Sequence, residues 1–408
     1  MTNHEPGGRS PRPVDQSTAH PDPRAEHEPK EPHELMVRGT AHVLATLPHL
    51  LGYLPDHSLV LVATTTERGA APGTHRGRMA FTLRQDLAPP AELPLLADVL
   101  GPPVAQAVRD HGERLVLHAV GYDLPEDASG EVDEGYAAAL LSSLQQVAER
   151  SGAVLRDLLH VRDGGRRYRP VLVEGRVVDL PWFAAAEPAD VPAVADLVLQ
   201  GRVALPSRAA VVASVRRRDE RAAAAASLAL DLLLLDPSRL DDEVALAALG
   251  SWVAHGEPVP GARDRAWIAV LLADRELRDA VLARWLPELF PLEELLDPDE
   301  ARRFRRLVPA WPAGQSEAAV DRLLHLAAGT PRGLTAPLLV LAGFLSWGHG
   351  EGTIANEACE LALEVEPGYR MAELLEEFLL RGVRPPCAGR GRTGRSAGRS
   401  GGRRGRAA

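Results

Sequence analysis

The chain has 408 residues, a formal net charge of −10 at pH 7 and 45% hydrophobic residues. Because a single hydrophobic core stops growing at about 250–300 residues, this length predicts two domains. Its two cysteines, Cys359 and Cys387, form no CxxC motif, which excludes a disulfide framework and a thiolate zinc site and fits a reducing compartment. Neither a signal-peptide core nor an apolar run of about 20 residues occurs. We therefore expect a cytoplasmic protein that does not enter a membrane.

Residues 1–33 are polar and rich in proline, with almost no aliphatic side chains. Such a segment cannot bury enough apolar surface to offset the conformational entropy that is lost on folding. We expect a disordered leader that ends before the first folded domain.

Strand-like and helix-like patterns alternate between residues 34 and 204. Four short runs of apolar and β-branched residues, each ending in turn residues or aspartate, predict buried strands. They lie at 58–65, 79–86, 114–123 and 154–163, with helical patterns at 93–112 and 136–152 and a hairpin loop at 67–78. This alternation predicts an α/β domain with a mixed or parallel sheet.

From residue 205 to residue 384 the composition shifts to Ala, Leu, Arg and Glu, interrupted by Gly and Pro. Runs such as 221–236 and 241–256 are typical of helices, because these residues have high helix propensity and the interruptions mark helix ends. The second domain is therefore expected to be all-helical.

The end of this domain, residues 336–384, has the spacing of small residues that is typical of a tetratricopeptide repeat. The matching positions are Gly343, Gly350, Ala355, Ala362 and Pro367. Small residues let two antiparallel helices cross closely, and the proline ends the second helix. A solenoid needs about three repeats, and one is visible here. We therefore expect a tetratricopeptide-like helical hairpin that packs on its own domain, rather than a peptide-binding superhelix.

Residues 385–408 contain seven arginines, seven glycines and no acidic residue, and we expect them to be disordered. Their charge of +7, within a total of −10, leaves −17 on the rest of the chain. The arginines could neutralise phosphates or stack on unpaired bases, as RGG-type segments do. Two other interpretations compete with this one. The arginines could reflect codon usage in a segment without a function, or the tail could contact the acidic remainder of the chain. The arginines are Arg390, Arg392, Arg395, Arg399, Arg403, Arg404 and Arg406.

Several catalytic classes are excluded by the residues that they require. Lys30, in the leader, is the one lysine of the chain, which excludes a Walker A loop, a Schiff-base lysine and a kinase-type phosphate lysine. Two GxSxG strings, at 394–398 and 398–402, and a GxGxxG string at 389–394 lie in the tail, without the strand and helix that such motifs need. We expect no cofactor.

His42 and His49 lie seven residues apart in a helical pattern, which separates them by about 10.5 Å along the helix. This distance is too long for both imidazoles to bind one metal ion, and the HExxH spacing of zinc-binding helices does not occur. We expect partly buried or surface histidines at both positions.

Three aspartates, Asp86, Asp123 and Asp163, lie at the carboxyl ends of predicted strands. Open α/β sheets bind ligands at this edge, and three converging carboxylates could hold Mg²⁺. Aspartate is also a preferred residue where a strand exits into a turn, because its side chain bonds the backbone two residues on. The catalytic hypothesis requires all three strands to be parallel and adjacent, so the turn interpretation is favoured.

Three stretches of the chain carry a resemblance to a known family. They are ATLPHLLGYLPDHSLVLV at 45–62, ADLVLQGRVALPSRAAVVASV at 195–215, and 342–386, which begins AGFLSWGHGEGTIANEACELALEVEPG. Together they are similar to the actinobacterial domain-of-unknown-function family 4192 (DUF4192), over roughly residues 35–386. The resemblance implies no activity, because the function of that family is unassigned.

The function expected from these observations is that of a non-enzymatic interaction or regulatory module with a protein partner. Two alternatives stay open. One is an enzyme with a metal or phosphate site at Asp86, Asp123 and Asp163, and the other is a nucleic-acid-associated protein that binds through the arginine-glycine tail.

Overall fold

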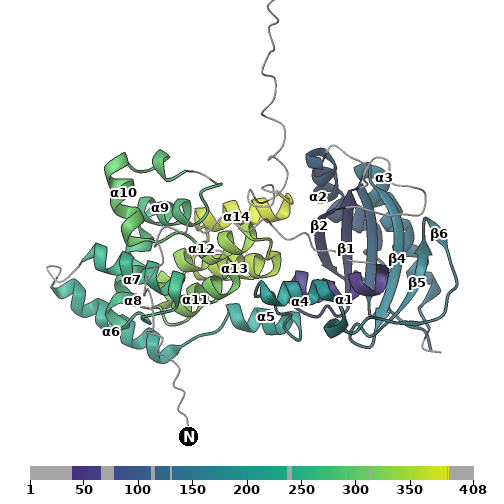
Figure 1. Ribbon diagram of the computed structural model, residues 1–408, viewed down its shortest axis with the longest axis horizontal. Coiled ribbons are helices and arrows are strands. Elements are labelled where there is room, and N and C mark those ends of the chain that lie inside the picture. Colours follow the sequence, from purple (N-terminus) through teal and green to yellow (C-terminus); the bar gives the residue numbers. More distant parts are fainter. Residues whose placement is uncertain are drawn as a thin grey trace, which may run out of the picture. The chain divides into compact units, whose positions relative to one another are not determined.

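The computed structural model describes residues 39–65, 78–111, 115–128, 131–236, 241–289, 291–312, 314–383 and 385. Within these ranges, a sheet with flanking helices comes first in the chain and a mostly helical region follows (Figure 1). The expected leader, most of the expected hairpin loop and the arginines of the tail lie outside the described residues. The predicted order of an α/β region and a helical region is confirmed.

The described strands form one seven-stranded sheet in the order β2-β1-β3-β4-β5-β6, with β7 paired to β5. They are β1 (Ser58–Thr65), β2 (Met79–Asp86), β3 (Leu115–Tyr122), β4 (Val154–Arg162), β5 (Arg167–Val173), β6 (Arg176–Val177) and β7 (Phe183–Ala184). All four strands expected from the sequence are present. β1 runs antiparallel to β2 and β3, β3 is parallel to β4, and β4 is antiparallel to β5. The sheet is therefore mixed.

Apolar layers cover both faces of the central strands. The covering helices are α1 (Gly39–Leu51), α2 (Leu96–His111) and α3 (Glu134–Ser151), with a short 3₁₀ turn, η1 (Leu93–Leu95), before α2. Leu59 and Leu61 of β1 pack with α2 and α3, whereas Val60 and Val62 pack with α1. Successive residues of a strand point to opposite faces, so a strand that is covered on both sides becomes a continuous apolar run in the sequence.

The strand directions determine where polar loops gather. β2 and β3 are both antiparallel to β1, and β4 is parallel to β3, so β2, β3 and β4 run in the same direction. The connections through α2 and α3 lie on one face, where both helices pack on the same apolar cluster. As a result, the carboxyl ends of these three strands lie along one edge of the sheet (Figure 1).

After η2 (Pro188–Asp190) and α4 (Pro192–Leu199), the chain enters the helical region, which we define as α5 to α14. Its helices are α5 (Arg208–Val215), α6 (Glu220–Leu235), α7 (Asp242–His255), α8 (Ala262–Ala273), α9 (Arg275–Trp285), α10 (Pro298–Leu307), α11 (Ser316–Ala328), α12 (Ala336–Gly348), α13 (Gly352–Val365) and α14 (Arg370–Leu380), with 3₁₀ turns η4 (Leu292–Glu294) and η5 (Arg332–Leu334). In the part of the chain that is described, no helix combines the length and apolarity required to cross a membrane.

α12 forms the centre of the helical core, since all thirteen of its residues are buried. A β-carbon at Gly343 would lie 2.7 Å from a methyl group of Leu375 in α14 and 3.5 Å from the carbonyl oxygen of Ala355 in α13. Glycine at this position therefore permits the close approach of α13 and α14. α12 and α13 lie within residues 336–384, for which the spacing of small residues predicts a helical hairpin.

Candidate functional site

The structure places two of the three predicted aspartates together. Asp123 directly follows β3 and Asp163 directly follows β4, two adjacent parallel strands. Asp86 ends β2, which is separated from β3 by the antiparallel β1. The Asp86 carboxylate is largely exposed and pairs with Arg84 at 2.5 Å. The requirement of three parallel, adjacent strands is therefore not met: β3 and β4 bring Asp123 and Asp163 together, but β2 is parallel to them without being adjacent, and Asp86 lies apart.

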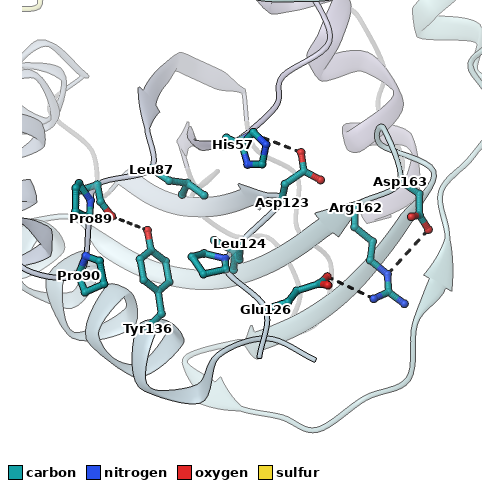
Figure 2. A pocket seen from close by; sticks show the side chains of 12 residues that line it. His57, Leu87, Pro89, Pro90, Asp123, Leu124, Glu126, Tyr136, Arg162 and Asp163 are labelled. Carbon is teal, nitrogen blue, oxygen red and sulfur yellow. Dashed lines mark hydrogen bonds and ion pairs between the residues drawn. The ribbon is translucent and has the colours of Figure 1, made fainter. Parts of the chain in front are cut away.

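A pocket of about 860 Å³ opens at this edge of the sheet (Figure 2). We call it the strand-end pocket, and it is lined by His57, Leu87, Ala88, Pro89, Pro90, Asp123, Leu124, Pro125, Glu126, Tyr136, Arg162 and Asp163. Half of these residues are apolar, and they come from the segments that follow β2 and β3. The polar half comes from the ends of β3 and β4, from His57 before β1 and from α3. The pocket thus has one apolar side and one charged side.

Three residues on the pocket rim adopt the left-handed backbone region that favours glycine. The φ angles are 39° at His57, 52° at Asp123 and 56° at Asp163. Aspartate and histidine tolerate this region better than most residues, and such conformations concentrate at ligand sites and at turns. Backbone hydrogen bonds hold the rim, from Asp123 N–H to the Val161 carbonyl at 2.8 Å and from Leu87 N–H to the His57 carbonyl at 3.0 Å. The rim is therefore fixed by the protein itself.

The charged side of the pocket has an excess of carboxylates. The lining holds three carboxylates, those of Asp123, Glu126 and Asp163, and one guanidinium, that of Arg162. Arg167, which is not part of the lining, lies 3.9 Å from the Asp163 carboxylate. Two ion pairs of Arg162 are long, at 3.5 Å to Glu126 and 4.0 Å to Asp163 (Figure 2). Asp123 accepts a hydrogen bond from the backbone N–H of His57 at 3.4 Å, which is longer than a typical N–H···O bond of about 2.9 Å. A positively charged group that entered the pocket could therefore make shorter contacts than those already present.

The position of Arg162 is fixed by an aromatic ring. Its guanidinium carbon lies 3.8 Å from the ring centroid of Trp182, and that of Arg169 lies 5.5 Å away. The imidazole of His160 packs edge-on against the same ring, with 4.9 Å between the two ring centroids. Burial and the positive charges of Arg169 and Arg162 lower the pKa of His160 to about 4, so this imidazole is neutral at pH 7. The stacked ring and the neutral histidine allow arginines to cluster beside the pocket.

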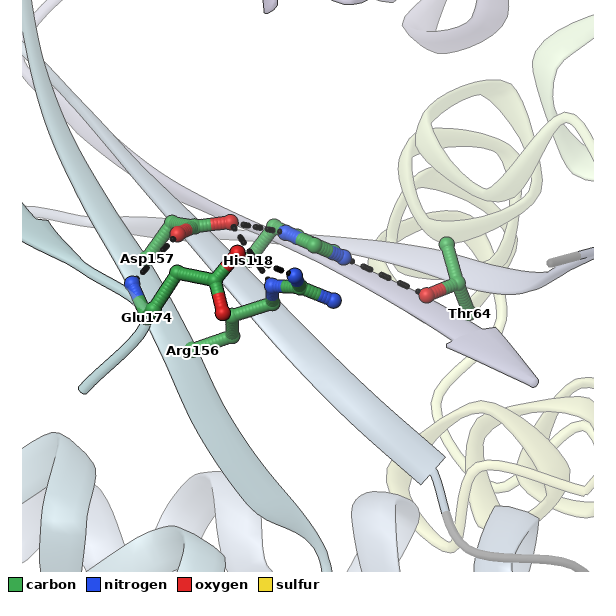
Figure 3. A network of polar contacts seen from close by, with 5 residues as sticks. All are labelled: Thr64, His118, Arg156, Asp157 and Glu174. Atoms are coloured by element: carbon green, nitrogen blue, oxygen red, sulfur yellow. Dashed lines mark hydrogen bonds and ion pairs between the residues drawn. The ribbon is translucent and has the colours of Figure 1, made fainter. Parts of the chain in front are cut away.

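A second polar cluster lies on the sheet itself (Figure 3). His118 of β3 places Nδ1 2.7 Å from the Asp157 carboxylate of β4, and its Nε2 lies 3.2 Å from the Thr64 hydroxyl of β1. The backbone N–H of Glu174 donates to Asp157 at 3.1 Å. Burial opposes the charged form of Asp157, but these hydrogen bonds outweigh it and lower the pKa of the carboxyl. The cluster therefore joins three neighbouring strands.

This hydroxyl–imidazole–carboxylate order resembles that of hydrolase triads. Such enzymes need N–H donors beside the hydroxyl to stabilise an oxyanion. Thr64 lies inside a strand that is paired on both sides, with Met79 of β2 and with Val116 of β3. The backbone N–H groups next to Thr64 point toward the neighbouring strands within the sheet. We therefore interpret the cluster as a polar connection between strands.

The predicted histidine positions are also described. His42 and His49 both lie on α1 and are half-buried. Nδ1 of His49 is 3.0 Å from the carbonyl oxygen of Arg202. Throughout the described ranges, no three His, Cys, Asp or Glu side chains are grouped so that they could hold a metal ion.

Sequence reasoning missed Thr64, His118, Asp157 and Trp182. A polar residue inside an apolar strand was a usable signal for His118 and Asp157, because both interrupt runs that otherwise read as core. Nothing in the sequence indicated which strands would be neighbours.

The arginines proposed for nucleic-acid binding, from Arg390 to Arg406, lie outside the described residues.

Comparison with known protein families gives a match, whereas comparisons with curated proteins and with solved structures returned none. The match is to a family model described as "Domain of unknown function (DUF4192)" and covers residues 41–386, most of the chain. The resemblance found in the sequence is confirmed, and the chain belongs to the DUF4192 family.

Proposed function

We propose that the protein is a non-enzymatic regulatory module that binds a small organic cation in the strand-end pocket. The observation that carries this proposal is the lining itself, in which three carboxylates oppose one arginine beside an apolar wall. A charged amine would be attracted by the carboxylates, and its hydrocarbon body would cover Pro89, Pro90 and Leu124.

The same lining argues against an anionic ligand. A phosphate would meet Asp123, Glu126 and Asp163, and Arg162 is the one cationic side chain of the lining. Like charges at such distances oppose binding unless the phosphate displaces existing ion pairs. The alternative of a metal-dependent enzyme at Asp86, Asp123 and Asp163 is kept as an outcome of the same experiment.

The binding test uses calorimetry and thermal-shift assays on the full chain. The probes are phenethylamine, agmatine and putrescine, with phenethyl alcohol and 1,4-butanediol as uncharged counterparts and MgCl₂ as the metal. We expect at least one amine to bind and its uncharged counterpart to fail. The central variant is Asp123→Asn, since asparagine also tolerates the left-handed backbone and keeps the turn intact.

Loss of a charge-assisted hydrogen bond costs about 1.5–3 kcal/mol, so we expect Asp123→Asn to weaken amine binding by about 10- to 100-fold. Asp86→Asn is the matched control, because it removes a carboxylate from the same sheet edge but outside the pocket lining. Equal losses in both variants, or no amine binding at millimolar concentration, would refute the proposal. A Mg²⁺ response that disappears in Asp86→Asn, Asp123→Asn and Asp163→Asn alike would support the metal-dependent enzyme.

Two further parts of the proposal concern the setting of the protein. We propose a cytoplasmic location and a protein partner, as the composition suggests. We also propose that α12 and α13 are a tetratricopeptide-like hairpin with a packing role. Supporting this, α12 is buried along its whole length, so it cannot line an open peptide groove.

A further inference from the structure

α6 presents leucine side chains to solvent. Leu228, Leu232 and Leu235 are 63%, 60% and 82% exposed. Their spacing of four and three residues places them on one side of the helix, and we call this surface the leucine face. The opposite side of α6 is buried, where Ala226 and Leu233 pack with Ala266 of α8.

Such a surface is unusual on a protein that acts alone. Single exposed leucines are common, but contiguous apolar patches on monomers usually mark an interaction site. The leucine face is also surplus to the packing of α6, because the helix already buries its other side. Each of the three leucines keeps an exposed fraction of at least 60% in the described part of the chain.

The leucine face has a pattern of large, small and charged side chains that suits a second copy of itself. A two-fold axis at Leu228 would place Leu232 of one copy opposite Ala224 of the other, and Ala224 is exposed. Large side chains would thus meet small ones, which permits close packing of the two helices. Leu228 would meet its own counterpart at the centre of an isologous contact.

Charges at the two ends of α6 favour the antiparallel arrangement. The exposed Arg221 lies at the amino end of the leucine face, and the exposed Asp231 lies toward its carboxyl end. With the two-fold axis at Leu228, each Arg221 lies opposite Leu235 at the carboxyl end of the other helix, one turn beyond Asp231. A parallel pair would place like charges opposite each other, and it would also align the two helix dipoles unfavourably.

We propose that the chain forms a homodimer through antiparallel packing of the leucine faces of two α6 helices. This inference goes beyond the proposed function, since no residue of α6 lines the strand-end pocket. Failure of one proposal therefore leaves the other intact.

Sedimentation equilibrium of the full chain between 1 and 200 µM tests the dimer. We expect dimerisation in this range, and we expect Leu228→Asp combined with Leu232→Asp to weaken it at least 100-fold without altering the circular dichroism spectrum. Leu234→Asp is the matched control, because Leu234 is 61% exposed on the same helix but points about 120° away from Leu228. It should change the dissociation constant by less than threefold.

A charge exchange tests the direction of packing. Arg221→Asp should weaken the dimer severalfold, and the double exchange of Arg221→Asp with Asp231→Arg should restore it. A wild-type chain that stays monomeric at 200 µM overturns the proposal, as does equal disruption by Leu234→Asp. A monomer whose α6 is protected from hydrogen exchange at every concentration would show that another segment of the chain covers the leucine face, and it would overturn the proposal too.

Discussion

In the sheet region, charged side chains line a pocket at the strand ends, whereas in the helical region one helix keeps a row of leucines on the surface. Asp157 and His118 lie on the sheet with a direct hydrogen bond between them, and Asp123 and Asp163 line a pocket. By contrast, α12 is buried throughout while α6 exposes its leucine face. Polar groups are costly to bury and leucines gain little from exposure. We therefore interpret the partly buried polar groups and the exposed leucines as positions that make specific contacts.

The largest expected effect separates two leucines of the helical region. Leu341→Ala in the buried α12 should destabilise that region by about 2–5 kcal/mol, because it leaves a cavity in the core. Leu232→Ala in α6 should change the free energy of unfolding of the monomer by less than about 0.5 kcal/mol. Denaturant unfolding at 1 µM, followed by tryptophan fluorescence, measures both, since five of the six tryptophans lie in the helical region. Similar losses in the two variants would mean that the leucine face is part of the core.

A buried ion pair gives the next effect. Glu357 of α13 is buried and lies 2.7 Å from Arg208 of α5 and 3.6 Å from Arg216, the residue directly after α5. Removing both arginines leaves an unpaired buried carboxylate, so Arg208→Ala with Arg216→Ala should cost about 3 kcal/mol. Glu357→Gln should cost about 1 kcal/mol, because the half-exposed arginines can be hydrated again. The comparison would fail if thermal unfolding showed the single substitution to be the more damaging.

Glu351 predicts a pH dependence of the helical region. Burial, and then the nearby carboxylate of Glu317, raise the pKa of Glu351 from 4.5 to about 7. A raised folded-state pKa gives stability that is complete below pH 4.5 and is lost as the pH rises through 7. Glu351→Gln should therefore stabilise the protein at pH 8, by about 3 kcal/mol, and have little effect at pH 4.5. Denaturant midpoints at the two pH values measure this, and an equal gain at both would contradict it.

The sheet region should show the opposite pH dependence with a smaller amplitude. The pKa of Asp157 is lowered, so its contribution to stability is present above the unfolded value of 3.8 and is lost as the pH falls through the folded value. Asp157→Asn should cost about 1 kcal/mol at pH 7, and the cost should shrink as the pH falls below 3.8. Far-ultraviolet circular dichroism during acid titration of the wild-type and variant chains measures the difference. Parallel titration curves for the two chains would show that Asp157 does not cause this pH dependence.

Local patterns explain how much of the fold could be predicted. The strands at 58–65 and 79–86 were predicted to the residue, because apolar runs and flanking turn residues mark a strand without knowledge of its neighbours. The contacts among Thr64, His118 and Asp157 depend on strand order and register. A register shift between Leu117 and His118 helps to set that alignment, and a sequence does not reveal it.

The candidate site follows the same division. Aspartates at strand ends could be predicted individually, but their grouping depended on the direction of β1, which lies between β2 and β3. The run at 221–236 was correctly predicted as helical. Its leucines resemble a core segment in the sequence, and only packing against α8 determines which of them stay exposed.

Hydrogen–deuterium exchange on the full chain tests most directly whether the two regions have separate contacts. An amine that binds should slow exchange at the amides of Leu87, Ala88, Asp123, Leu124 and Glu126, beside the strand-end pocket, and leave residues 224–235 of α6 unchanged. Raising the protein concentration from 1 to 100 µM should protect residues 224–235 and leave the pocket segments unchanged. Protection of both regions by either treatment alone, or of neither region by both, would contradict the account.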